Sequence, residues 1–141
     1  MTYYPDLSPC GYFDNWEQTL VAVGWLEPGQ SFTTGPVPET FLNRLVELTK
    51  VAVQKRTVGC MMGFHRCGIC KEKGLYTERA LKIGEKTIQV GQRNLFVPGS
   101  GGSVYVAPSL IIHYIVEHQY CPPEVFQEAV MGCPRMGSLA Y

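Results

Sequence analysis

The strongest chemical signal in the sequence is a short segment that holds one imidazole and two thiols. His65, Cys67 and Cys70 lie within six residues of one another. A Cys-x-x-Cys pair can turn a tight loop in which both thiolates face one ion, and tetrahedral zinc takes sulfur and nitrogen ligands of this kind. The segment therefore predicts half to three-quarters of a Zn²⁺ site.

The remaining ligands have to come from elsewhere, because a closed structural zinc site needs four and the sequence has no second Cys-x-x-Cys pair. His113 lies in an apolar stretch, where a buried imidazole needs a partner, either a metal ion or a backbone carbonyl. Cys133 and Cys60 are reserve ligands. His118 follows His113 by five residues, about 140° around a helix, so we expect it to point away and to favour the negative end of the helix dipole.

Two enzymatic interpretations stay open as alternatives. A zinc-dependent hydrolase would leave one metal position open to water and would need a general base, for which Glu117 and Asp14 are the candidates. A thiol redox protein would use Cys67 and Cys70 at the start of a helix, but residues 71–74, Lys-Glu-Lys-Gly, form a poor helix broken at the glycine. No catalytic constellation is complete, so we expect a structural metal and no catalytic residues.

The elements that would position these residues are short strands and helices. Hydrophobic patterning and turn residues predict strands at 20–26, 57–64, 86–90, 94–98 and 103–107, and helices at 38–50, 109–118 and 124–131. The strand at 57–64 would deliver His65 and the cysteines, which places the metal loop at a strand end. The order predicts the α+β class, with a small mixed or antiparallel sheet and about three helices.

Length and charge narrow the class of protein further. The 141 residues fit one domain, 1–141. Twelve basic residues balance twelve acidic ones, which gives no strong signal for nucleic acid or an anionic membrane surface. There is no leader pattern and no apolar run of about 18 residues, so we expect a cytoplasmic protein without a membrane span. In that reducing compartment clustered cysteines bind metal more often than they pair.

Several motifs together resemble a group of small, uncharacterised bacterial proteins. They are Tyr-Pro-Asp-Leu-Ser-Pro at 4–9, Val-Ala-Val-Gly-Trp-Leu at 21–26, the His-x-Cys-x-x-Cys loop at 65–70, Phe-Val-Pro-Gly at 96–99, a Tyr-Val segment at 105–106 leading into an Ala-Pro-x-Leu-Ile-x-His-Tyr-Ile helix at 107–115, and Pro-Pro-Glu-Val-Phe at 122–126. The resemblance covers nearly the whole chain. It implies a bacterial single-domain protein with His65, Cys67, Cys70 and His113 as the metal ligands, and it implies no activity.

We therefore expect a zinc-stabilised bacterial protein whose partner is another protein. An immunity or antitoxin-type protein, which binds and blocks one cognate partner, is a sharper form of this hypothesis. That role needs a small, rigid and nearly neutral domain without an active site, and the charge balance agrees with it. The hydrolase and the thiol redox protein remain the alternatives.

Overall fold

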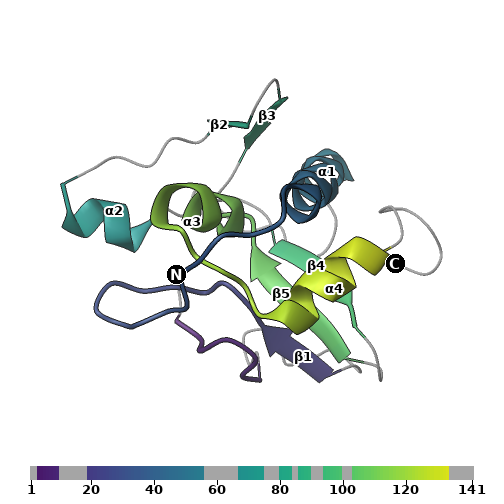
Figure 1. Ribbon diagram of the computed structural model, residues 1–141, viewed down its shortest axis with the longest axis horizontal. Coiled ribbons are helices and arrows are strands. Elements are labelled where there is room, and N and C mark those ends of the chain that lie inside the picture. The colour runs from purple at the N-terminus through teal and green to yellow at the C-terminus, as the bar shows by residue number, and fades with distance from the viewer. Residues whose placement is uncertain are drawn as a thin grey trace.

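The computed structural model describes residues 3–9, 19–55, 67–74, 80–83, 86–89, 94–99 and 103–133. These residues form β1 (Thr19–Ala22), α1 (Glu39–Lys55), α2 (Gly68–Glu72), β2 (Ala80–Ile83), β3 (Lys86–Gln89), β4 (Asn94–Pro98), β5 (Ser103–Pro108), α3 (Ile111–His118) and α4 (Glu124–Gly132) (Figure 1). The predicted α+β class is confirmed. The strand expected at 57–64 lies outside the described residues, as do His65, Cys60 and Asp14.

The main sheet is mixed and has the order β1-β5-β4. Strand β5 pairs antiparallel with β4, so the strands predicted at 94–98 and 103–107 form a hairpin, and it pairs parallel with β1. β1 is shorter than the expected strand, because the chain leaves the sheet at Gly24, whose φ of 79° is not an extended conformation. Strand β3, predicted at 86–90, pairs with β2 in a separate antiparallel ladder.

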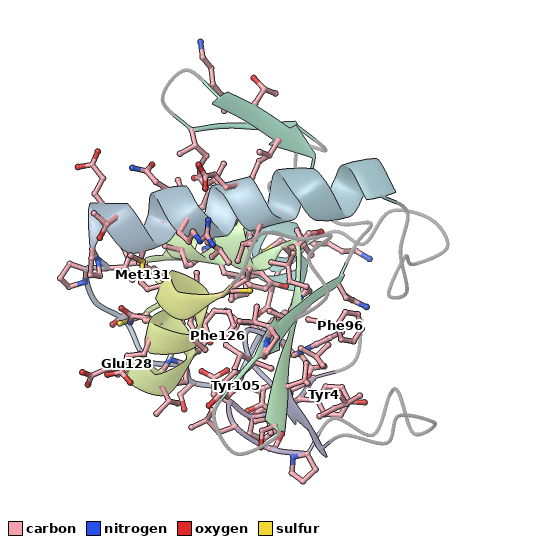
Figure 2. The ribbon with its side chains drawn as sticks, turned by 90° about the vertical axis from the view of Figure 1, so that its right-hand side faces the viewer. Tyr4, Phe96, Tyr105, Phe126, Glu128 and Met131 are labelled. Atoms are coloured by element: carbon pink, nitrogen blue, oxygen red, sulfur yellow. The ribbon has the colours of Figure 1, made fainter. Side chains whose placement is uncertain are left out.

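One face of the main sheet carries the larger core, beneath α1, α3 and α4. The ring of Phe126 on α4 meets Phe41 of α1 and Tyr105 of β5 edge-on, at centroid distances of 6.2 and 5.9 Å. Figure 2 shows Phe126 and Tyr105 on the same side of the sheet. Cys67 and Cys70 belong to this same core. The cysteine pair is thus joined to the main hydrophobic cluster.

The opposite face carries a smaller core around Trp25. The indole N–H of Trp25 donates to the carbonyl of Val106 at 2.8 Å, and Tyr4 meets the Trp25 ring edge-on at 5.6 Å. Figure 2 shows Tyr4 and Phe96 together on this side. Both faces of the sheet therefore carry buried apolar side chains. Separately, no helix among the described residues is long and apolar enough to cross a bilayer.

The N-terminal segment, residues 3–9, is tied to the rest of the protein by Asp6. One carboxylate oxygen, Oδ1, accepts from the backbone N–H of Gly24 at 3.0 Å, and Oδ2 accepts from the hydroxyl of Tyr120 at 2.7 Å. Burial and the neighbouring carboxylate raise the pKa of Tyr120 above its ordinary range, so the hydroxyl keeps the proton that it donates. Asp6 thus links the segment to the end of β1 and to the residues after α3.

Replacing Asp6 should measure this link. We expect Asp6→Ala to lower the free energy of unfolding by about 2 kcal/mol, because the fully buried Tyr120 loses a charged acceptor. Urea denaturation followed by tryptophan fluorescence would measure the loss. Ser8→Ala is the matched control in the same segment, since its hydroxyl bonds Pro5 at an exposed position and its loss should cost far less. Equal losses in the two variants would contradict the proposed link.

Candidate metal centre

The short helix α2 places the two cysteines on one side of a single turn. Cys67 immediately precedes the helix, and its Sγ accepts a hydrogen bond from the backbone N–H of Cys70 at 3.4 Å. Both side chains are buried, with exposed fractions of 0% and 5%. The helix stops before Gly74, whose φ is 76°, so the predicted break at this glycine is confirmed. Helix α2 nevertheless extends through Lys71 and Glu72, where the sequence predicts only a poor helix.

Helix α2 packs closely against the loop that follows β1. A Cβ atom added at Gly68 would lie 3.0 Å from Cδ of Pro28, a tighter approach than ordinary van der Waals contact. Glycine at this position therefore allows the helix to sit on the loop. On this side, the α2 turn that carries Cys70 lies against the ring of Pro28.

Helix α3 places the two histidines. His113 is buried, and His118 is the last helical residue and is half-buried. Their ring centroids lie 5.1 Å apart, so the expectation that His118 points away from His113 was wrong. The 140° estimate locates Cα atoms only, whereas helical side chains tilt toward the N-terminus. The imidazole of His118, at the C-terminal end of the helix, can therefore lean back toward His113 in the preceding turn. The 140° angle alone does not include this tilt of the side chain.

The four side chains converge on a common point. The Sγ atom of Cys70 lies 3.3 Å from Nε2 of His113 and 3.3 Å from Nε2 of His118, and Sγ of Cys67 lies 3.4 Å from Nε2 of His118. All four donor atoms lie within 4.8 Å of one another. Zinc bonds of about 2.3 Å to sulfur and about 2.0 Å to nitrogen, set tetrahedrally, separate the two kinds of donor by about 3.5 Å. The group therefore has the donor types and the spacing to hold a metal ion.

The other candidate ligands have different positions. Cys133 is buried near α1, where the guanidinium of Arg44 donates to its backbone carbonyl, and it is not a member of the group. Glu117, the candidate general base, is exposed on α3 and is also not a member. His65 and Cys60 lie outside the described residues, so their roles stay predictions. The structure thus brings three of the expected ligands, Cys67, Cys70 and His113, together with the unexpected His118.

Burial controls the protonation of this group. It raises the pKa of the Cys67 thiol to about 11, against a smaller opposing effect of the backbone hydrogen bond from Cys70. It also lowers the pKa values of His113 and His118 below the ordinary imidazole range, assisted by their mutual repulsion at His113 and by Lys73 at His118. Neutral imidazole is the form that binds metal, and the thiol must lose its proton on binding. A redox-active thiol needs a lowered pKa, which Cys67 does not have.

Comparisons with known proteins identify an uncharacterised family. A family profile described as a domain of unknown function (DUF7919) matches residues 2–131, a range that includes all four members of the Cys/His group. Searches of curated proteins and of solved structures found no match. Because the profile covers nearly the whole chain, this protein belongs to the DUF7919 family of domains of unknown function.

Proposed function

We propose that the protein is a zinc-stabilised domain that binds another protein, and that Cys67, Cys70, His113 and His118 hold one structural Zn²⁺. The observation that carries the proposal is the convergence of four donor atoms within 4.8 Å of one another. Two thiols and two imidazoles are a ligand set of structural zinc sites, and they suit zinc better than the oxygen-seeking magnesium and calcium ions.

The number of ligands favours a structural role over a hydrolytic one. Four protein ligands complete a tetrahedral zinc site, whereas catalytic sites keep one position for water and place a base beside it. His118 fills the fourth position in the group, and the candidate base Glu117 is exposed and is not part of the group. The raised pKa of Cys67 argues in the same way against a thiol redox protein. The geometry thus supports the hydrolase and redox alternatives less well.

The helix that carries the cysteines is the element that would gain most from a metal cross-link. Helix α2 has five residues, and isolated helices of this length are not stable in water. Within the helix only Cys70 is buried, and Cys67 precedes it. When bound, Zn²⁺ would supply a cross-link between this turn and α3. Residues 71–74 next to the cysteines are all exposed, so the cross-link would hold a polar surface in a fixed position.

Binding to another protein is the role that this arrangement suits. Because a fixed, charged turn does not have to be ordered when a partner binds, the entropic cost of association is lower. An immunity or antitoxin-type protein in the bacterial cytoplasm is the specific form that we propose. Affinity purification of the tagged protein from its native host tests it, with a stoichiometric partner toxin as the expected result. Recovery without any stoichiometric partner would contradict this specific form.

Metal content is the direct test of the site. We expect about one zinc ion per chain by plasma mass spectrometry of the purified protein, and loss of that zinc in Cys67→Ser and in Cys70→Ser. Cys121→Ser is the matched control, because Cys121 is a half-buried free cysteine outside the group, and this variant should keep its zinc. Wild-type protein purified without metal, or variants that keep it, would overturn the proposal.

A further inference from the structure

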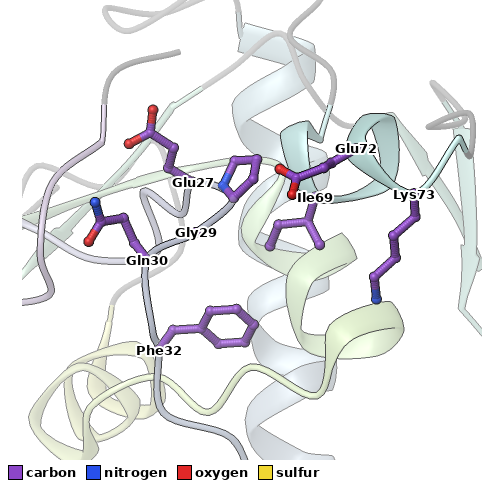
Figure 3. A pocket seen from close by; sticks show the side chains of 8 residues that line it. Glu27, Gly29, Gln30, Phe32, Ile69, Glu72 and Lys73 are labelled. Atoms are coloured by element: carbon purple, nitrogen blue, oxygen red, sulfur yellow. The ribbon is translucent and has the colours of Figure 1, made fainter.

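A pocket lies beside the metal centre, between α2 and the loop of residues 27–32. Its volume is about 220 Å³, and it opens to solvent. One wall is made by residues 27–30 and Phe32, and the other by three side chains of the α2 turn, as Figure 3 shows. The loop wall and the α2 wall touch through Pro28 and Gly68. The pocket therefore exists only where α2 is held against this loop.

The interior of the pocket is apolar and well fixed. Phe32 and Ile69 are both half-buried and pack against the main core. The ring of Phe32 is held edge-on against Tyr120 at a centroid distance of 6.0 Å. Ile69 stands between Cys67 and Cys70 in the sequence, so a metal ion bound by these cysteines would fix its backbone from both sides. A ligand would meet a rigid aromatic ring on one side and an aliphatic side chain on the other.

The edge of the pocket carries two acidic groups, and neither forms an ion pair with a basic residue in the described part of the chain. Glu27 and Glu72 are exposed, and among the described residues the one ion pair joins Arg44 to Glu47 instead. Figure 3 shows the Glu72 carboxylate directed toward the loop wall, whereas Lys73 extends along the far side of the pocket. In the same view the ammonium group of Lys73 points toward the end of α3, away from the loop wall. The side of the pocket next to the loop is therefore acidic.

We propose that this pocket receives an arginine side chain presented by a protein partner. At about 220 Å³ it is smaller than the roughly 300–1,000 Å³ of small-molecule sites, and its size suits one long side chain. Arginine combines an aliphatic stem with a flat cationic group that stacks on aromatic rings and pairs with carboxylates. The stem would lie between Phe32 and Ile69, and the guanidinium would face the Glu72 carboxylate. The Glu27 carboxylate, which points away from Phe32 and Ile69 in Figure 3, would add negative charge from the outer side of the loop. The inference depends on the proposed function, because the metal fixes the α2 wall.

Titration with a short peptide tests this binding. The probe is the capped tripeptide Gly-Arg-Gly, added to zinc-loaded protein while the methyl signal of Ile69 is followed by nuclear magnetic resonance. We expect a saturable shift, and no shift with the same peptide carrying citrulline, which keeps the shape and removes the charge. The Glu27→Gln/Glu72→Gln variant should bind on the order of tenfold more weakly.

A second double variant controls for the change in net charge. Glu124→Gln/Glu128→Gln removes the same charge from α4, which lies away from α2 in Figure 1, and should leave the affinity unchanged.

Three results would each overturn the inference: equal shifts with the citrulline peptide, a stronger shift with Gly-Glu-Gly, or tighter binding of free arginine than of the peptide. Zinc measured on the same sample separates the two proposals. A zinc-loaded protein without a peptide shift overturns only the pocket, and a protein without zinc overturns the proposed function.

Discussion

Removal of the metal from the zinc-loaded protein is expected to lower the free energy of unfolding by at least about 4 kcal/mol. A ligand that binds only the folded state stabilises it by about 4.1 kcal/mol when its free concentration is 1,000 times the dissociation constant. Structural zinc in small peptides contributes more, on the order of 10 kcal/mol at neutral pH. Urea denaturation of one sample with and without a strong chelator measures the difference.

The reason for so large an effect is the way in which α2 is attached. Cys67 and Cys70 are the buried side chains of the turn, and Ile69 is half-buried. Without the ion, the turn loses its metal cross-link to α3 and is held by the burial of Cys67 and Cys70, the apolar contact of Ile69 and the approach of Gly68 to Pro28. The Cys67→Ser/Cys70→Ser variant is the control, because its stability should already be low and should not respond to chelator. An unchanged urea midpoint after the zinc has demonstrably left would show that the metal is not structural.

Local patterns were sufficient to predict the regular elements whose signals lie within one stretch of sequence. The apolar helix that carries His113, the final helix after the Pro-Pro pair and the hairpin of β4 and β5 all lie where hydrophobic spacing and turn residues place them. Helix α1 continues to Lys55, five residues beyond its expected end at 50. Periodicity identifies such elements well and their ends less well, because end positions depend on capping and packing.

Two features of the fold depend on contacts between distant segments. Strand β1 pairs parallel with β5, with Leu20 opposite Val104, and no property of either strand alone selects that partner. The five-residue helix α2 has weak intrinsic helical propensity and is favoured by the burial of Cys70 and the hydrogen bond from its N–H to Cys67. Tertiary packing overrides local preference in such short elements.

The candidate site was partly accessible from residue type alone. Cys67 and Cys70 stood out through their spacing, and His113 through the cost of burying an imidazole. His118 was missed because an angle between Cα positions was used where the direction and reach of the side chain decide the outcome. His65 is the ligand predicted for the corresponding position, and this stays a prediction because His65 lies outside the described residues. A pair of variants can decide between the two histidines.

Substitution of His118 is expected to weaken zinc binding by more than about 100-fold. Loss of a group that only orients a ligand costs about 10- to 100-fold in metal affinity, so loss of a ligand itself should cost more. His65→Ala is the matched control, and it should bind zinc with nearly wild-type affinity if His118 is the fourth ligand. Competition with a chelator of known affinity gives both values, and His113→Ala shows the size of the effect at a buried member of the group.

Cobalt substitution compares His118 with His65 as ligands by the spectrum of the bound metal, without a measurement of affinity. The visible spectrum of the Co²⁺ protein should be that of a tetrahedral site with two sulfur and two nitrogen ligands, because four donor atoms already converge. His118→Ala should change this spectrum toward a site that admits water, while His65→Ala should leave it unchanged. If instead His65→Ala alters the spectrum and His118→Ala does not, the ligand set is His65, Cys67, Cys70 and His113, and the closeness of His118 to the two thiols reflects packing.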